Sequence, residues 1–296
     1  MLKLKKIIAS VLGKLAYYFN IYFKKNKRLK VYSIDETLES IIKHKYSVVR
    51  FGDGELTIVS GKSIKFQNYN KELAESLMNI MALDIDGLII CVPDVFGNLG
   101  IYTERCQSFW RYHLLKFRKL WYACFDSSSK YHNAFISRLY MEYQNKEKSV
   151  EWFNAIKKIW KDKEIIIIEG EFSRLGVNND LFKGAKSIER ILAPSINAFD
   201  KLDLILEEAL KVDKRKLILV ALGPTAKIVT YELFMKGYQC IDIGHIDIEY
   251  EWYLAQTTTK IAIRDKYTNE VITQSLNKSY TDDEYMTQII ANLNKG

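Results

Sequence analysis

Two acidic residues, separated by one glycine, follow the first apolar run of the chain after its N-terminal region. The stretch Arg50-Phe51-Gly52-Asp53-Gly54-Glu55 comes directly after residues 46–49. Glycine permits backbone conformations that a Cβ atom forbids, so Asp53 and Glu55 could both face one cation from a tight turn. Oxygen ligands of this kind suit Mn²⁺ or Mg²⁺, and such a cation would hold a diphosphate. An Asp-Gly turn with a solvent-facing glutamate is the alternative that the pattern leaves open.

Other polar residues follow later apolar runs in the same way. They are Arg174, Gly176, Asn179 and Asp180 after 165–168; Ser195 and Asn197 after 188–192; Gly223, Pro224, Thr225, Ala226 and Lys227 after 217–222; and His245 and Asp247 after 240–243. In an open α/β sheet, ligands bind beyond the carboxyl ends of the strands. If the strands are parallel, these residues converge on one edge and are candidates for binding a ligand or for catalysis.

Several of these residues have chemistry that suits a phosphorylated ligand. A helix that starts near Thr225 would offer free backbone N–H groups to an anion, and Arg174 could form a forked pair with phosphate. Arg174 and Lys227 could also offset the negative charge of a bound diphosphate. Asn179 could hydrogen-bond a ribose or a base, and so could Asp180. Ordinary turns, helix caps and surface ion pairs are the alternatives for all of these positions.

His245 stands at the end of an apolar run with Asp247 two residues later. A neutral imidazole there could ligate a metal, bind phosphate or accept a proton, and a structural histidine is the alternative. Asp247, Glu249 and Glu251 recur at period two, so they would share one face if that segment is extended. Among them Asp247 is the first candidate for the base that takes a proton from a sugar hydroxyl.

Several enzyme classes lack their usual motifs in this chain. It contains no GxGxxG, no P-loop lysine motif, no GxSxG and no HExxH, which removes support for dinucleotide binding, P-loop NTPases, acyl transfer and zinc hydrolysis. Its four cysteines show no CxxC spacing, so the sequence predicts neither a disulfide framework nor a zinc cluster, as in a reducing compartment.

Alternating helical and apolar patterns predict the elements that would position these residues. Helices are expected at 35–43, 71–83, 104–121, 131–143, 150–160, 198–211, 226–236 and 282–293, and strands at 48–51, 88–92, 165–168, 188–192, 217–222 and 240–243. The strand candidates are rich in Ile and Val without polar alternation, which is typical of strands buried on both faces. The sequence therefore predicts an α/β fold with a Rossmann-like, mostly parallel sheet flanked by helices.

The net charge of +8 is concentrated at the N-terminus. Residues 1–30 contain nine Lys or Arg and no acid, whereas residues 31–296 contain 35 basic and 36 acidic residues. We therefore divide the chain into a basic amphipathic arm, 1–30, and a single domain, 31–296. A near-neutral body argues against nucleic-acid binding. The arm is too interrupted by polar residues to span a membrane; it suits the surface of an anionic membrane, or else packs on the body.

Four segments, taken together, resemble the GT-D-type glycosyltransferases. These are bacterial enzymes with a Rossmann-like fold, first known as a domain of unknown function, whose metal-binding motif is Asp-x-Glu. The segments are 50–55, 169–182, 185–200 and 242–252. In order they cover roughly residues 35–270, and they are specific together where each alone is not. The resemblance implies that Asp53 and Glu55 bind Mn²⁺ or Mg²⁺. It also implies a donor pocket, in which we place Arg50, Gly52, His245 and the turn at 223–226.

The resemblance further implies the reaction. We expect a hexosyltransferase that moves a hexose from a nucleotide sugar, with a UDP-sugar as the expected donor. The acceptor would be a glycan, a glycoprotein or a lipid-linked molecule in bacterial surface glycan synthesis, and Glu55, His245 and Asp247 are the candidate catalytic residues. We expect a cytoplasmic protein, peripheral on the inner leaflet through residues 1–30. The alternatives are a Rossmann-type transferase or oxidoreductase that uses another nucleotide cofactor, and a non-catalytic scaffold at the membrane surface.

Overall fold

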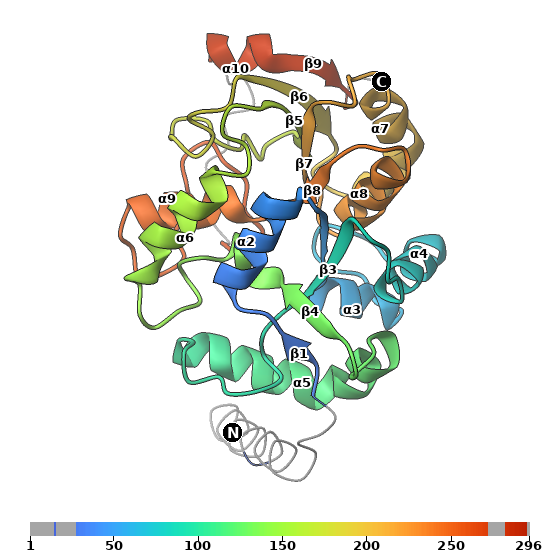
Figure 1. Cartoon of the computed structure of the whole chain (residues 1–296), viewed down its shortest axis with the longest axis vertical. Helices are drawn as coiled ribbons and strands as arrows, with labels where there is room; N and C mark the ends of the chain where they lie inside the picture. The colour runs from blue at the N-terminus through green and yellow to red at the C-terminus, as the bar shows by residue number, and fades with distance from the viewer. Residues whose placement is uncertain (1–14, 16–27, 272–281, 295–296) are drawn as a thin grey trace.

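One parallel sheet runs through the computed structural model, which describes Leu15, residues 28–271 and residues 282–294. Within these residues nine strands are hydrogen-bonded in the order β1-β4-β3-β2-β8-β7-β5-β6-β9, and every pair is parallel (Figure 1). The strands are β1 Lys30–Val31, β2 Ser47–Arg50, β3 Leu88–Val92, β4 Lys130–Asn133, β5 Glu164–Gly170, β6 Ser187–Ala193, β7 Leu217–Ala221, β8 Cys240–Asp242 and β9 Ile289–Asn292. The prediction of a Rossmann-like, mostly parallel α/β sheet is confirmed.

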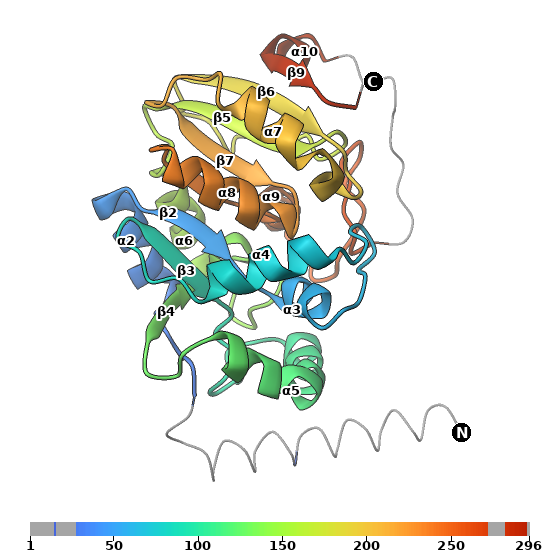
Figure 2. The same ribbon diagram turned by 90° about the vertical axis from the view of Figure 1, so that its right-hand side faces the viewer.

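Helices cover both faces of this sheet. α4, α7 and α8 lie on one face, and α2, α6 and α9 lie on the other (Figures 1 and 2). The α-helices are α2 Ile34–His44, α3 Asp53–Val59, α4 Lys71–Met81, α5 Glu104–Cys124, α6 Lys148–Lys157, α7 Leu202–Ala209, α8 Thr225–Met235, α9 Ile246–Leu254 and α10 Asp283–Gln288, and the 3₁₀ turns are η2 Ala134–Ser137 and η3 Ala198–Lys201. None of these helices combines the length and the hydrophobicity needed to cross a bilayer.

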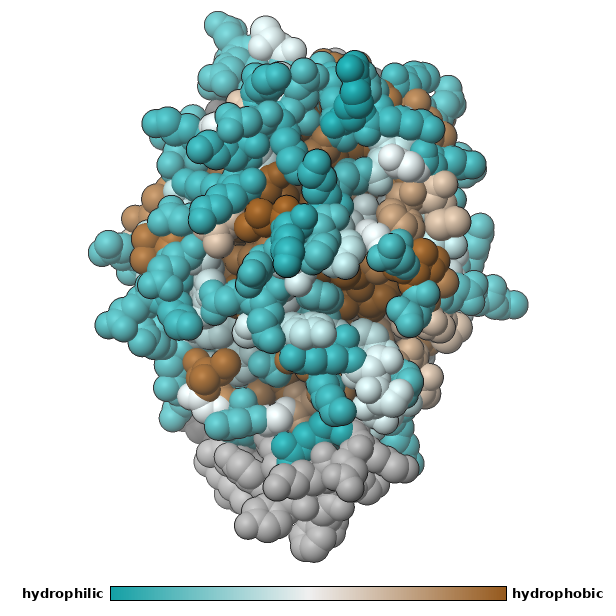
Figure 3. Space-filling model, viewed as in Figure 1, coloured by the Kyte–Doolittle hydropathy of each residue, from teal (hydrophilic) through white to brown (hydrophobic). Residues whose placement is uncertain are grey.

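The apolar strands divide the hydrophobic core into two parts. Along β5, Ile166 and Ile168 pack in a cluster with α7 and α8, whereas Ile165 and Ile167 point to the opposite face and belong to the larger cluster, which also includes residues of α4. All four side chains are fully buried, because successive residues of a strand point to opposite faces and both faces are covered. On the side shown in Figure 3 the surface is mostly hydrophilic, with hydrophobic atoms in small patches between polar side chains.

Local capping signals fix where several helices begin. Ser33 and Glu36 form a capping box at the start of α2, Asn70 caps α4 and Thr103 caps α5 through their side-chain oxygens. The acid pair is also helical: Asp53 and Glu55 lie in the first turn of α3, not in an isolated tight turn.

Two sequence-based expectations are wrong, each because a tertiary contact outweighs the local pattern. The helix expected at 131–143 is instead β4 followed by η2, since β4 pairs with both β1 and β3. The helix expected at 282–293 ends at Gln288 and continues as β9, which pairs with β6. The condition under which Asp247, Glu249 and Glu251 would share one face is not met, because their segment is not extended but forms α9. The proposed arm, 1–30, lies almost entirely outside the described residues, so its role stays a prediction.

Candidate active site

A pocket of ≈ 620 Å³ opens beyond the carboxyl ends of the central strands. Its walls include the residues that follow β2, β5, β6, β7 and β8, together with the start of α5 and the loop near residues 267–270. This is the edge on which the sequence placed the candidate residues, and it is the edge where open α/β sheets bind their ligands.

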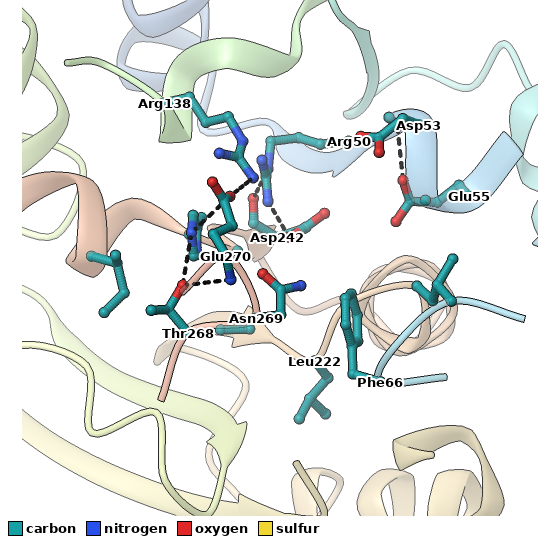
Figure 4. A pocket seen from close by; sticks show the side chains of 18 of the residues that line it. Arg50, Asp53, Glu55, Phe66, Arg138, Leu222, Asp242, Thr268, Asn269 and Glu270 are labelled. Carbon is teal, nitrogen blue, oxygen red and sulfur yellow. Dashed lines mark hydrogen bonds and ion pairs between the residues drawn. The ribbon is translucent and has the colours of Figure 1, made fainter. Parts of the chain in front are cut away.

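The acid pair enters this pocket from the junction of β2 and α3. Glu55 is buried, and its Oε2 accepts a hydrogen bond of 2.8 Å from the backbone N–H of Gly52, which closes the first turn of α3. Asp53 is accessible from the pocket (Figure 4). The Asp53 carboxyl group is nevertheless surrounded by protein, and this desolvation raises its pKa. The charge of Arg138 opposes the rise, and the charge of Glu55 adds to it.

Behind the acid pair lies a buried chain of charges formed by Arg50, Glu55, Lys227 and Asp242, which we call the inner ion-pair chain. Lys227 Nζ lies 2.8 Å from Glu55 Oε1 and 3.1 Å from Asp242 Oδ2. Arg50 Nη2 lies 2.7 Å from Asp242 Oδ1, and Arg50 Nε donates to the Asp242 carbonyl at 2.7 Å. Burial alone would raise the pKa of the Asp242 carboxyl, but Arg50 and Lys227 hold it below its usual value.

One glycine is required for this chain to form. Gly244 has φ +41°, and a Cβ atom there would lie 2.1 Å from Arg50 Nη2. Any other residue at this position would therefore displace the Arg50 guanidinium as well as adopt a backbone conformation that favours glycine.

A second group of charges lines the other side of the pocket. It consists of Arg138, Glu142, His245, Lys260 and Glu270, and we call it the outer ion-pair cluster. Figure 4 labels Arg138 and Glu270 of this cluster. Glu270 Oε1 lies 2.6 Å from Arg138 Nη2 and 3.0 Å from His245 Nε2, while Glu270 Oε2 pairs with Lys260. Lys260 Nζ also lies 2.8 Å from Glu142 Oε1.

Two groups of this cluster have shifted pKa values. Burial lowers the pKa of His245, and the opposing charge of Glu270 does not reverse that shift, so the imidazole is neutral at neutral pH. Burial alone would raise the pKa of Glu270, but Arg138 and the other basic groups around it hold that pKa well below the usual range. A neutral imidazole beside an ionised carboxylate can accept a proton from a bound hydroxyl group.

Asp247 also reaches the pocket, but both of its carboxylate oxygens are occupied. Oδ1 accepts hydrogen bonds from Gly176 N and Asn179 Nδ2, each at 2.8 Å, and Oδ2 lies 2.8 Å from Lys266 Nζ. Lys266 in turn contacts Glu251 at 2.7 Å, one turn further along α9. This arrangement anchors the loop to the helix and leaves Asp247 less suited than His245 to take a proton.

A short hairpin closes the pocket from the side of α3. Ile64 and Gln67 form an antiparallel bridge, so Lys65 and Phe66 stand at its tip. The Phe66 ring lies against Gly223, where a Cβ atom would be only 2.5 Å from the ring. Lys65 Nζ donates to the Asn269 carbonyl at 3.3 Å, which connects the hairpin to the loop on the opposite side.

The predicted site residues separate into two groups. Those that line the pocket are Arg50, Gly52, Asp53, Glu55, Ser195, Gly223, Lys227, His245 and Asp247; those outside its lining are Arg174, Gly176, Asn179, Asp180, Asn197, Pro224, Thr225 and Ala226. Members of the second group hold neighbouring segments instead. Arg174 donates to the Asp265 carbonyl at 2.6 Å, Asp180 pairs with Lys157, and the Asn197 side chain accepts from the Asn68 backbone N–H. These residues support the pocket rather than line it.

Sequence reasoning assigned no role to five residues that prove central to the pocket: Phe66, Arg138, Asp242, Lys260 and Glu270. Asp242 did carry a signal, because it is an acid at the very end of an apolar strand. Arg138 was hidden inside a segment whose pattern predicted a helix. Lys260 and Glu270 lie in a stretch without regular secondary structure, where no periodicity marks their position.

The residues present fit a cation whose ligands come partly from the protein and partly from a bound substrate. Within the described part of the chain no group of three or more His, Cys, Asp or Glu side chains is arranged to hold a metal. Asp53 and Glu55 together offer two carboxylates, and Asp53 faces the pocket with a pKa raised by desolvation. Mg²⁺ is usually bound by one or two carboxylates, with substrate phosphates and water completing its coordination.

Comparison with known proteins agrees with this geometry. The family described as "Glycosyltransferase GT-D fold" matches residues 48–271. A solved structure described as a domain of unknown function 1792 with a distinct glycosyltransferase fold superposes with a TM-score of 0.86. It is 42% identical in sequence, and the match covers 91% of this chain and 97% of that one.

Two curated relatives match most of this chain. The first is "Probable glycosyl transferase Gly" of Streptococcus gordonii, 42% identical over 270 residues. The second is "Glycosyltransferase GlyD" of Streptococcus pneumoniae, 38% identical over 266 residues. Each match covers 90% of this chain, but only 39% and 33% of the respective relative, so the chain corresponds to one part of those longer proteins.

Proposed function

Because the chain belongs to the family of glycosyltransferases with the GT-D fold, we propose that it transfers a hexose from a nucleotide sugar, a UDP-sugar, to an acceptor hydroxyl. One observation carries this proposal: two carboxylates, Asp53 and Glu55, lie in the first turn of α3 and line a pocket that also contains Lys227, Arg138 and a neutral histidine. A diphosphate, a metal ion and a hydroxyl nucleophile need these groups close together.

In this proposal Asp53 and Glu55 hold Mn²⁺ or Mg²⁺. A bound cation of this kind supplies positive charge that stabilises a departing diphosphate. Asp53 is the more available ligand, since Glu55 is paired with Lys227 and with the Gly52 N–H. Contacts with Asp242 and the Gly223 carbonyl hold the Lys227 ammonium group beside the acid pair. From there it adds to the stabilisation of negative charge on the departing diphosphate.

His245 is our candidate for the group that accepts the acceptor proton when the transfer inverts the anomeric centre. Its imidazole is neutral, it lines the pocket, and Glu270 at 3.0 Å stabilises the imidazolium that forms. Thr268 Oγ1, 3.4 Å from the same nitrogen, helps to orient the ring. Asp247 remains the second candidate, less favoured by its contacts with Lys266 and Asn179.

The acceptor belongs to bacterial surface glycan synthesis in this proposal, and residues 1–30 bring the enzyme to the inner leaflet. The support for the second part is the concentration of nine basic residues without an acid in that segment. Deletion of residues 1–28 would lower binding to anionic liposomes, and unchanged binding would contradict this part alone.

The decisive experiment is a screen of UDP- and GDP-sugars for metal-dependent hydrolysis by the natural chain and by Glu55→Gln. We expect hydrolysis of a UDP-sugar that requires Mn²⁺ or Mg²⁺ and that falls about 100-fold in the variant, since a charged metal ligand is lost. Glu36→Gln is the matched control. Glu36 accepts a hydrogen bond from the backbone N–H of the residue before α2, as Glu55 does before α3, but it does not line the pocket, so the substitution would leave hydrolysis unchanged.

Two outcomes would contradict the proposal. Equal rates for Glu55→Gln and the natural chain would separate the acid pair from catalysis. A thermal shift with NAD or S-adenosylmethionine, but none with UDP plus Mn²⁺, would favour a different nucleotide cofactor. If no nucleotide sugar releases UDP with or without acceptor, a scaffold at the membrane surface becomes the better explanation.

A further inference from the structure

Helix α5 carries large hydrophobic side chains on its outer face. Phe109, Tyr112 and Leu115 are 48%, 61% and 55% exposed, and their spacing of three residues places them along one side of the helix. The opposite side of α5 is buried through Trp110 and Trp121. Isolated exposed hydrophobic residues are ordinary, but three successive ones on one helix face indicate a surface that meets something other than water.

Cations lie among these hydrophobic side chains. Arg105, Lys116 and Lys119 are exposed on the same face of α5. The helix as a whole contains five basic residues and one acid, although residues 31–296 contain slightly fewer basic than acidic residues. α5 is therefore a basic element on a body that is otherwise acidic.

The position of α5 relates this face to the pocket. Arg105 and Phe109 belong to the pocket lining, so the outer face of the helix continues directly into the mouth of the pocket. α5 and β1 lie at the same end of the molecule (Figures 1 and 2), and in the sequence the basic segment 1–30 leads into β1. The basic N-terminal segment is thus connected, through β1, to the end of the domain that carries α5.

We propose that the outer face of α5 docks on an anionic membrane surface and that the acceptor is a lipid-linked sugar presented from that membrane. This inference rests on the proposed function. Aromatic and aliphatic side chains interleaved with lysine and arginine are the composition of helices that lie in the membrane interface, where cations meet lipid phosphates. A second copy of the chain is a poorer occupant, because two such faces would bring like charges together.

The docking half of the proposal is tested by binding of the full chain to vesicles of phosphatidylglycerol and phosphatidylcholine. Tyr112→Ser/Leu115→Ser would weaken binding about ten-fold, since two interfacial anchors are lost. Lys116→Gln/Lys119→Gln would weaken it about 20-fold at low salt, and neither natural chain nor variant would bind pure phosphatidylcholine tightly. Met235→Ser/Leu254→Ser is the control: both residues are comparably exposed but lie on α8 and α9, so binding would not change.

Unchanged vesicle binding in both α5 variants would overturn the proposal. It would also be overturned if the natural chain is a dimer that the Tyr112→Ser/Leu115→Ser variant dissociates, since a second copy would then cover the face. A loss of thermal stability in the Tyr112→Ser/Leu115→Ser variant, without a loss of vesicle binding, would indicate that residues 1–27 of the same chain cover this face. That result would also overturn the proposal.

The acceptor half is tested by comparing two reactions. Hydrolysis of the UDP-sugar without acceptor would be unchanged by Lys116→Gln/Lys119→Gln, because neither side chain lines the pocket. Transfer to a lipid-linked sugar in vesicles would fall about ten-fold or more in this variant, whereas transfer to the same sugar in soluble form would not. Equal loss with both acceptors would overturn the proposal. Absence of hydrolysis in the natural chain would instead contradict the proposed function, and vesicle binding would still decide the role of α5.

Discussion

The two charged groups of the pocket differ in what holds them. The inner ion-pair chain is built on regular elements: Arg50 ends β2, Asp242 ends β8, and Glu55 and Lys227 lie in the first turns of α3 and α8. Its side chains are 1–11% exposed. The outer ion-pair cluster instead connects residues 138–142 and the start of α9 to residues 255–271, which have no helix or strand, and its members reach 30% exposure.

This difference implies different functions for the two groups. Charges that are buried at strand ends are fixed by the sheet, so the inner ion-pair chain determines where the acid pair points. The outer ion-pair cluster holds residues 255–271 in place, which no helix or strand hydrogen bonds do, so it determines the shape of the pocket mouth. Breaking the inner group should therefore affect the stability of the whole fold, and breaking the outer group should affect mainly residues 255–271.

The largest effect is expected for Asp242→Ala. The substitution leaves Arg50 and Lys227 buried with one carboxylate between them, and breaking a buried pair in this way costs about 3–5 kcal/mol of unfolding free energy. Chemical denaturation would measure it. Asp213→Ala is the control, since Asp213 also pairs with an arginine but at the surface, and its midpoint should not move. Equal midpoints for both variants would remove the distinction between the inner group and ordinary surface pairs.

Gly244→Ala tests the inner ion-pair chain through the backbone. A Cβ atom at this position meets the Arg50 guanidinium, so we expect a loss of about 2–4 kcal/mol in unfolding free energy. Gly237→Ala is a matched control, because Gly237 also has positive φ, +88°, with nothing within 4 Å of the added atom. It should lose only about 1–2 kcal/mol. If the two variants lose the same amount, the contact with Arg50 contributes nothing.

Glu249 gives the outer region a pH dependence. It is fully buried beside Arg138 and Glu142, accepts hydrogen bonds from Tyr140 N and Met141 N, and burial raises its pKa to about 7. Because this pKa is above the value in the unfolded chain, the stabilising contribution is complete below about pH 4.5 and is lost as the pH rises through 7.

The variant Glu249→Gln tests this pH dependence. The natural chain should lose about 2 kcal/mol relative to the variant between pH 5 and pH 8, measured by denaturation at each pH. Parallel pH curves for the two proteins would show that Glu249 has an ordinary pKa.

The smallest effect on global stability is expected for Glu270→Gln. It weakens the contacts with Arg138, His245 and Lys260, which are partly exposed, so the unfolding free energy should fall by only about 1 kcal/mol. Limited proteolysis should nevertheless cleave faster within residues 255–271, because local opening becomes easier. Glu208→Gln, which weakens a surface pair with Lys211, should leave that cleavage rate unchanged.

The same difference explains what the sequence could predict. Apolar runs such as β3, β5 and β7 were found because burial on both faces leaves a continuous hydrophobic pattern. The acid pair, Lys227 and His245 were found because they directly follow such runs. β4 and β9 were missed because their strand character comes from pairing with distant strands, and local pattern carries no record of those partners.

The outer residues show where sequence reasoning ends. Lys260 and Glu270 reach the pocket only because tertiary contacts place their segment there, and nothing periodic precedes or follows them. Conversely, Asn179 and Asp180 looked suitable for binding a ligand because of their chemistry, but their side chains serve neighbouring segments. Residue type alone does not distinguish a ligand contact from a loop anchor.

The order of strands in the sheet has a consequence for synthesis of the protein on the ribosome. β2 lies between β3, which follows it closely in the chain, and β8, about 190 residues later. The Arg50–Asp242 pair joins residues separated by 192 positions. The early strands can therefore pair while translation continues, but Arg50 waits for its partner until those further residues have emerged. During that interval the edge of β2 is exposed to non-native strand pairing. The rate of elongation, or a chaperone that binds at this stage, would therefore determine how much of the protein folds correctly.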